Sequence, residues 1–270
     1  MCGLRALVRM LGIVALVVLA CSGCAADRPM TIRVLSYNIH HGEGMDERVD
    51  LERIARLIRE TNADLVALQE VDRGVRRTNQ VDEPARLAEL TGMTAVFERN
   101  IVFQGGDYGN AVLSRLPIER HQNHYLPQSQ PDEQRGALEV HVRAGNRKLV
   151  FFATHLDYRE NDAERMLSIE LFEKLLAPLR EMPVIMAGDF NARPDSRVMV
   201  RARTILVDTF DVGTGPGFTF PASEPDRRID YIMHNGHLDL RCVEFRVIPE
   251  PVASDHRPIL AVFELGKAPR

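Results

Sequence analysis

The sequence predicts an α/β protein in which two packed β-sheets carry helices on their outer faces. Many short apolar segments are rich in β-branched residues, few segments show helical periodicity, and several neighbouring strands are joined as hairpins. The chain has 270 residues, 45% hydrophobic and 27% charged, which is enough for one domain with a sizeable core. Neither a low-complexity linker nor an internal repeat interrupts it, so we expect one domain over residues 31–265.

Strands and helices alternate in the first part of the chain. Residues 31–39 (TIRVLSYNI) and 64–70 (DLVALQE) predict strands. Between them, apolar residues recur at helical spacing over 51–58, and Asp50 is in position to cap that helix. A second short helix is predicted within 84–92, because a proline suits the first turn of a helix and a glycine its end.

The rest of the chain predicts mostly β structure, with one more helix over residues 163–179. Residues 144–147 (AGNR) favour a hairpin turn between two of the strands. The predicted strands cover residues 109–115, 135–143, 148–156, 183–190, 227–234, 238–248 and 257–265.

The N-terminal segment has the pattern of an export signal. Two arginines precede the apolar run 11–20, and small residues follow in CSGCAAD (21–27). The run is shorter than the roughly 20 apolar residues that span a bilayer as a helix. We therefore expect a signal peptide over residues 1–20 and a tether over 21–30.

The sequence VLAC (18–21) resembles the lipobox of bacterial lipoproteins. This resemblance predicts lipidation of Cys21 and a lipid anchor in the membrane of the cell envelope, with the domain on the periplasmic or extracellular side. Cleavage after Ala26 is the alternative, and it would give a freely secreted protein.

The mature chain is acidic. Cleavage before Cys21 removes two arginines and no acidic residue, and changes the formal net charge from −4 to −6. General binding to duplex DNA usually requires a basic excess or stripe, so we expect no stable nucleic-acid partner. Only Cys24 and Cys242 would remain beside Cys21, which excludes a disulfide scaffold. We expect a monomer.

Six stretches place an acidic, amide or imidazole group beside apolar sequence. They contain Asn38, Glu70, His155, Asp189 with Asn191, Asp230, and Asp255 with His256. Burial of such groups without partners is costly, so we expect the six stretches to converge on one site. Asp189 and Asn191 would share a face if the strand geometry continued, and a polar turn is the alternative interpretation.

The ligand types favour Mg²⁺ or Mn²⁺, because carboxylate and amide oxygens are hard donors; Ca²⁺ is a further possibility. A zinc hydrolase would need clustered His or Cys ligands, and neither an HExxH nor a CxxC motif is present. Histidines added to an oxygen-rich metal site suit phosphoryl transfer, in which cations stabilise the developing charge.

Together these stretches resemble the endonuclease/exonuclease/phosphatase superfamily, through LQEV (68–71), GDFN (188–191) and SDHRP (254–258). The resemblance covers about residues 31–265. It implies a four-layer α/β/β/α sandwich with the site at one end of the sheets. It also implies a Mg²⁺ site.

For the metal site, the resemblance implies that Glu70 is the main ligand, with Asn38 beside it and Asp255 completing the set. For catalysis, it implies the roles of five residues (Asp189, Asn191, His256, Asp230, His155). Asp189 would orient or deprotonate the attacking water, with help from Asn191. His256, oriented by Asp230, would stabilise the transition state, and His155 would contact a phosphate oxygen.

Four further residues are candidates for contact with the substrate. His41 lies in the loop after the first strand, and the alternative interpretation is a solvated histidine without a role in binding. Arg135, Tyr108 and Asn110 lie in predicted strands or beside them, where an exposed strand residue is the alternative interpretation.

The sequence thus predicts a divalent-metal phosphohydrolase, foremost a phosphodiesterase, that works outside the cytoplasm on a small or lipid-derived phosphate ester. An exported nuclease and a sphingomyelinase-like lipid phosphodiesterase are the alternatives within the family. A non-catalytic envelope-binding protein is the alternative from another class.

Overall fold

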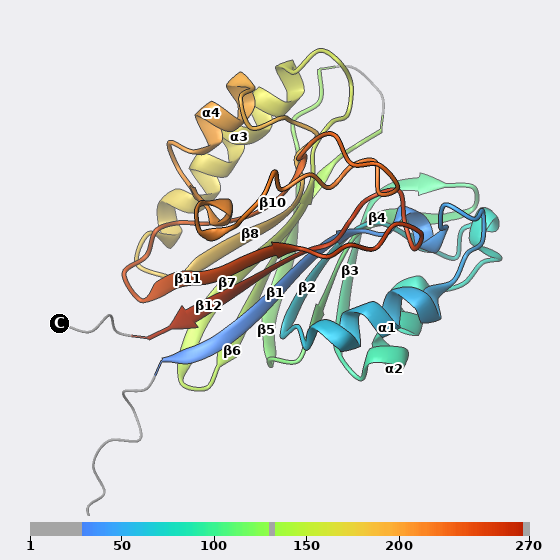
Figure 1. The fold of residues 1–270 in the computed structure, drawn as a ribbon, viewed down its shortest axis with the longest axis horizontal. Coiled ribbons are helices and arrows are strands. Elements are labelled where there is room, and N and C mark those ends of the chain that lie inside the picture. Colours follow the sequence, from blue (N-terminus) through green and yellow to red (C-terminus); the bar gives the residue numbers. More distant parts are fainter. Residues whose placement is uncertain (1–28, 130–132, 267–270) are drawn as a thin grey trace, which may run out of the picture.

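The computed structural model describes residues 29–129 and 133–266 and contains two six-stranded sheets packed face to face (Figure 1). The first sheet has the order β11-β12-β1-β2-β4-β3 and the second β5-β6-β7-β8-β10-β9. Parallel pairing joins β1 to β2 and β7 to β8, and the other neighbours are antiparallel. This confirms the predicted sandwich of two mixed sheets.

The strands of the first sheet are β11 (Leu240–Val247), β12 (Ile259–Leu265), β1 (Met30–Asn38), β2 (Leu65–Arg73), β4 (Gly106–Ser114) and β3 (Thr94–Phe103). Those of the second sheet are β5 (Ile118–Tyr125), β6 (Gly136–Ala144), β7 (Arg147–His155), β8 (Val184–Asp189), β10 (Asp230–His234) and β9 (Val207–Asp208). The α-helices are α1 (Leu51–Thr61), α2 (Glu83–Thr91), α3 (Ala163–Leu176) and α4 (Arg197–Ala202), and the 3-10 helices are η1 (His40–Gly42), η2 (Arg76–Thr78), η3 (Ala177–Leu179) and η4 (Thr209–Val212).

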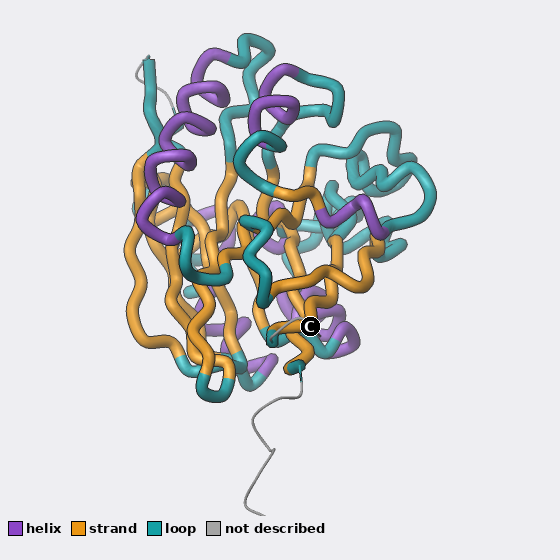
Figure 2. Tube along the Cα trace, turned by 90° about the vertical axis from the view of Figure 1, so that its left-hand side faces the viewer, coloured by secondary structure: helices purple, strands orange, loops and turns teal. Residues whose placement is uncertain are grey.

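Three apolar clusters hold the four layers together. The cluster between the sheets includes Val34, Phe151 and Ile259. A second cluster packs α3 and α4 against one sheet, and a third packs α1 and α2 against the other. Figure 2, turned by 90°, shows the strands grouped together with the helices outside them. Burial of an apolar face on each side of a sheet is what fixes this layering.

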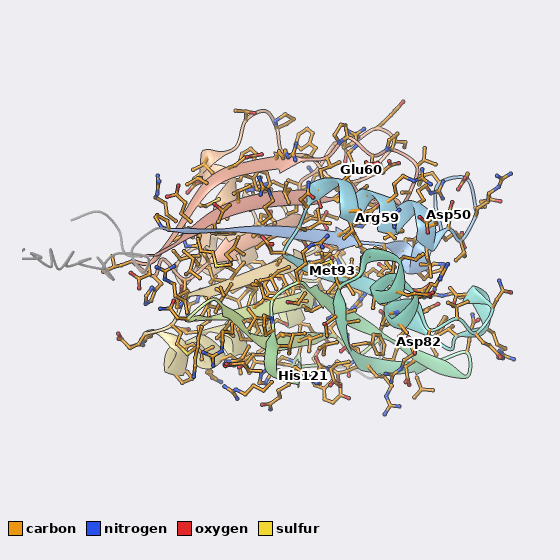
Figure 3. All side chains as sticks on the ribbon, turned by 90° about the horizontal axis from the view of Figure 1, so that it is seen from below. Asp50, Arg59, Glu60, Asp82, Met93 and His121 are labelled. Carbon is orange, nitrogen blue, oxygen red and sulfur yellow. The ribbon has the colours of Figure 1, made fainter. Side chains whose placement is uncertain are left out.

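The helix ends follow the expected capping chemistry. The Asp50 carboxylate accepts a hydrogen bond from the Arg53 N–H at 3.0 Å and begins α1. Asp82 caps α2 in the same way, and Gly92 ends it in the left-handed conformation at φ +67°. Figure 3 marks Asp50 at one end of α1, with Arg59 and Glu60 toward the other.

Several predicted boundaries need correction. The helix predicted over 163–179 is α-helical only to Leu176, because Pro178 cannot donate a backbone hydrogen bond and a 3-10 turn follows. Strands β3 (Thr94–Phe103) and β5 (Ile118–Tyr125), each at an edge of its sheet, and helix α4 (Arg197–Ala202) were not predicted. The polar sequence of β5 is typical of an edge strand. The predicted hairpin turn between Ala144 and Arg147 is confirmed.

Candidate active site

A cavity of about 310 Å³ opens at the end of the sandwich where β1, β7 and β8 finish. It is lined by Glu70, Arg77, Ile101, Phe103, Tyr108, Glu133, Arg135, His155, Tyr158, Asp189, Asn191 and His256. Met30, where β1 begins, pairs with Leu265 at the opposite end of the strands. The cavity and the start of the domain therefore lie at opposite ends of β1.

Strand register brings three of the predicted residues into one row. His155 ends β7 and Asp189 ends β8, and the two residues are partners in the parallel ladder. Asp230 begins β10, which runs antiparallel to β8 and pairs Asp230 with Asp189. Neighbouring strands lie about 4.8 Å apart, so this register alone places the three side chains close together.

The stretch from Asp189 to Asn191 is a turn and also part of the cavity wall. Strand β8 ends at Asp189, and Asn191 has a left-handed backbone at φ +47°, so the strand geometry does not continue and the turn alternative describes the backbone. The Asn191 N–H donates to Asp189 Oδ1 at 2.8 Å, the local bond by which Asp stabilises turns. Both side chains nevertheless line the cavity.

His256 lies between two carboxylates. Its Nδ1 is 3.0 Å from Asp230 Oδ2, and its Nε2 is 3.6 Å from Asp189 Oδ2. Burial alone would lower the pKa of His256, but the charges of Asp230 and Asp189 outweigh burial and raise it to about 10. The imidazole is therefore cationic at neutral pH.

Burial also governs Asp189, whose side chain is almost inaccessible. It raises the pKa of the Asp189 carboxyl to about 7, although the cationic His256 opposes the shift. A carboxylate with a pKa near neutrality is well suited to accept a proton from water.

His155 is neutral, in contrast to His256. Burial, followed by the neighbouring positive charge of Arg135, holds the pKa of His155 well below its usual range, so the ring is neutral. Arg135 Nη1 lies 2.9 Å from Nδ1 of His155, and a guanidinium can only donate. Its Nε2 lies 3.1 Å from Asn191 Nδ2 and 3.5 Å from Asp189 Oδ2.

A β-bulge delivers Glu70 to the cavity. The register between β2 and β4 shifts between Leu68 and Val71, and Glu70 has a left-handed backbone at φ +58°. Bulges often re-aim side chains beside active sites. The Glu70 side chain reaches the cavity, where Asn38 Nδ2 donates to its Oε1 at 2.9 Å.

The carboxylates of Glu70 and Asp189 fit a divalent cation. Asn38 Nδ2 contacts both, at 2.9 Å and 3.3 Å, so two acidic groups face one cavity. The cavity arginines Arg77 and Arg135 pair with Asp72 and Glu133 rather than with Glu70. Adjacent carboxylates repel unless a cation neutralises them, and oxygen donors of this kind suit Mg²⁺ or Mn²⁺.

Asn38 stays a predicted ligand of the metal. In the structure its amide nitrogen faces the carboxylates of Glu70 and Asp189, and its Oδ1 accepts from the His40 N–H at 3.1 Å. Asp255 is half-buried beside His256, does not line the cavity, and accepts a hydrogen bond from Ser254 Oγ at 3.3 Å.

The four candidate substrate contacts divide into two pairs. Arg135 and Tyr108 line the cavity. Asn110 and His41 do not: Asn110 is buried and donates to the Gly136 carbonyl at 2.9 Å, which ties β4 to β6 across the two sheets.

The sequence did not single out Arg77, which lies beside Phe103 and Tyr108 in the cavity wall. Arg77 is held by Asp72 through contacts of 2.8 Å and 2.9 Å, and its guanidinium stacks over Phe103 at 4.8 Å and Tyr108 at 5.4 Å. These residues come from a 3-10 turn and a hairpin with no recognisable motif. Tyr158, 60% exposed, lies under Arg135.

The chain is similar in sequence to known proteins. Residues 35–256 match the model of the "Endonuclease/Exonuclease/phosphatase family". The uncharacterized protein YbhP of Escherichia coli K12 is 30% identical over 215 residues, which cover 75% of this chain and 84% of that protein.

Solved structures agree as well. An endonuclease/exonuclease/phosphatase from Beutenbergia cavernae superposes with a TM-score of 0.74 at 28% identity, covering 88% of this chain and 72% of that one. A Bacteroides thetaiotaomicron protein described as a mannosyl-6-phosphatase superposes with a TM-score of 0.70 at 19% identity, covering 86% and 99% of the two chains. The chain belongs to the endonuclease/exonuclease/phosphatase family.

Proposed function

We propose that the protein hydrolyses small phosphodiesters with Mg²⁺ or Mn²⁺. Members of its family act as phosphoesterases, nucleases and phosphatases and depend on divalent metals. The observation that carries the proposal is the contact of a neutral imidazole, a cationic imidazole and a buried carboxylate around one cavity: Asp189 Oδ2 lies 3.5 Å from His155 and 3.6 Å from His256.

Each of these groups has a distinct task in the hydrolysis. Asp189 accepts the proton of the attacking water, because burial gives it the basicity of a group that titrates near neutrality. His256 supplies positive charge next to the phosphate as negative charge develops, and Asp230 holds its ring through Nδ1.

Two neutral side chains complete the contacts to the phosphate. His155 presents its imidazole, and Asn191 presents an amide whose nitrogen also donates to the Leu156 carbonyl at 3.1 Å. Glu70 would hold the divalent ion, with Asn38 and Asp255 as proposed further ligands. The bound ion would supply Lewis-acid stabilisation of the phosphate oxygens.

Size and charge favour a small ester over duplex DNA. The cavity of about 310 Å³ suits a small organic phosphate, and a formal charge near −6 after cleavage offers no general attraction to a polyanion. Arg77 and Arg135 are local phosphate contacts, since guanidinium groups bind phosphate through paired donors. Phe103 and Tyr108 provide an apolar wall for the leaving group.

We also propose that the protein is an exported lipoprotein anchored through Cys21, with residues 21–30 as the tether. Cys21 lies outside the described residues. Among the described helices, none has the length and apolar character needed to cross a bilayer. The nine residues of β1 span about 27 Å at 3.3 Å per residue, which separates the tethered end from the cavity and favours a soluble substrate. A mature mass that begins after Cys21 and carries no acyl groups would rule out the anchor.

A panel of substrates tests the function. kcat/KM is measured on bis(p-nitrophenyl) phosphate, p-nitrophenyl phosphate, sphingomyelin and plasmid DNA at fixed salt, with Mg²⁺, Mn²⁺ or EDTA. We expect the soluble diester to be cleaved fastest and EDTA to abolish cleavage. Full activity after exhaustive chelation would overturn the metal requirement. Plasmid nicking that exceeds the diester rate by orders of magnitude would make the protein a nuclease.

A further inference from the structure

The turn after β1 holds two histidines beside Glu70. His40 and His41 are consecutive residues of η1, and their ring centroids lie 4.4 Å apart. One possible ligand atom from each of His40, His41 and Glu70 lies within 4.8 Å of the other two. Zinc binds such atoms at about 2.0–2.2 Å, so two donors on one ion lie up to about 4.4 Å apart. The observed spacing needs little adjustment to enclose an ion.

Glu43 fixes the proton on each ring. His40 Nδ1 lies 3.2 Å from the Glu43 carbonyl, which can only accept, so Nδ1 carries the proton and Nε2 keeps its lone pair. His41 Nε2 lies 3.4 Å from the Glu43 carboxylate, which places the proton on Nε2 and leaves the lone pair on Nδ1. Metal-binding histidines are oriented in this way, by donation from the second ring nitrogen to a carbonyl or carboxylate.

The free lone pair of His41 is buried. The His41 side chain is 5% exposed, and within residues 29–129 and 133–266 its Nδ1 has no hydrogen-bond partner. A buried polar atom without a partner is costly, and native proteins contain few of them. This nitrogen is therefore available as a ligand atom.

We propose that His40, His41 and Glu70 form a second divalent-metal site, selective for ions of the zinc class. Imidazole nitrogen favours Zn²⁺ over Mg²⁺, whereas the oxygen donors around Asp189 favour Mg²⁺. The inference rests on the proposed function only in that both sites use Glu70. The charge of nearby Arg77 is balanced by its two contacts with Asp72. These three ligands do not form a local zinc motif such as HExxH, because only the fold brings Glu70 close to His40 and His41.

Zinc retention in excess Mg²⁺ tests this site without any substrate. The protein is dialysed against micromolar Zn²⁺ with millimolar Mg²⁺, and its metal content is counted. Co²⁺ then replaces Zn²⁺, so that visible absorption reports nitrogen coordination. We expect one equivalent of Zn²⁺ in the wild-type protein. His41→Asn, which tolerates the left-handed backbone at φ +45°, should bind Zn²⁺ at least tenfold more weakly.

Two further variants complete the test. Glu43→Ala keeps both imidazoles but loses the side-chain acceptor that orients His41, and it should weaken Zn²⁺ binding by roughly 10–100-fold. His121→Asn, at an exposed histidine of β5, should bind as the wild type does. Wild-type protein that retains no Zn²⁺ in excess Mg²⁺, or His41→Asn with unchanged affinity, would overturn the site. Either result would leave the hydrolysis proposal standing, since no turnover is measured.

Discussion

Asp189 and Asp230 face each other across β8 and β10, and the His256 ring contacts both carboxylates, through Nε2 at 3.6 Å and Nδ1 at 3.0 Å. The cationic His256 thus lies between Asp189, which we assign as the general base, and Asp230, which we propose orients the imidazole ring. The two aspartates differ in their proposed roles because Asp189 contacts Nε2 of His256 and Asp230 contacts Nδ1.

Asp189→Asn should fold normally and lose most hydrolysis. The amide preserves the shape of the side chain and can still accept from the Asn191 N–H, but it cannot take a proton from water. We expect kcat to fall by roughly a hundredfold or more, in line with the loss of a general base. Asp195→Asn, at an exposed carboxylate nearby in the chain, is the matched control. Normal turnover by Asp189→Asn would remove its essential acid/base role.

Asp230→Asn should act through His256. The loss of the Asp230 charge lowers the pKa of His256, because that charge is the main cause of its elevation, and the ring also loses its orientation. His256→Ala should lower kcat by roughly a hundredfold and spare metal binding, on the scale of losing one charge-stabilising group. The double variant should be little worse than His256→Ala alone. Fully additive losses would show that the two residues act independently.

The pH profile of kcat/KM should be bell-shaped. Activity rises with pH as Asp189 loses its proton, and the raised pKa places this limb above the ordinary carboxyl range, up to about pH 7. Activity falls again when His256 loses its proton, with a limb near pH 10. In Asp230→Asn both limbs should move to lower pH, because the Asp230 charge raises the pKa of His256 and also that of Asp189. An alkaline limb unmoved in that variant would contradict the assignment of His256.

Glu83 should make folding stability depend on pH. Burial raises the pKa of Glu83 from 4.5 to about 8, and its Oε2 accepts from the Asp72 N–H at 2.8 Å. The folded protein therefore keeps a proton that the unfolded chain releases near pH 4.5. The Glu83 contribution is complete below that pH and is lost as the pH rises to about 8, by up to about 1.4 kcal/mol per unit.

Urea unfolding at pH 6 and pH 8.5 checks this dependence. Glu83→Gln cannot ionise, so it should gain stability relative to the wild type at the higher pH. Glu60→Gln, at the exposed end of α1 that Figure 3 marks, should follow the wild type at both pH values. A constant difference between Glu83→Gln and the wild type at the two pH values would show that Glu83 is ionised throughout.

The sequence predicted most of the fold, because strand, helix and turn signals are local. It also gathered Glu70, Asp189 and His256 into one site, where the structure places them. The left-handed backbone at Glu70 and Asn191 was not predictable, since each depends on a bulge or turn set by neighbouring strands. Arg77 was missed for a similar reason: only the packing of a 3-10 turn against a hairpin brings it to the cavity.

The direction of the Asn38 amide was also beyond the sequence. Whether an asparagine offers oxygen or nitrogen depends on the groups around it, here Glu70 and Asp189 on one side and the His40 N–H on the other. A motif identifies the residue type and leaves its orientation open.

The two halves of the site belong to different sheets. Glu70 and Asn38 come from the first sheet, and His155, Asp189 and Asp230 from the second, with Val34, Phe151 and Ile259 packed between the layers. The proposed hydrolysis thus depends on the contact between the layers, because the apolar side chains there set the distance between the proposed base and the proposed metal ligand. We expect a change in the volume of these side chains to alter turnover even while each sheet keeps its own hydrogen bonds.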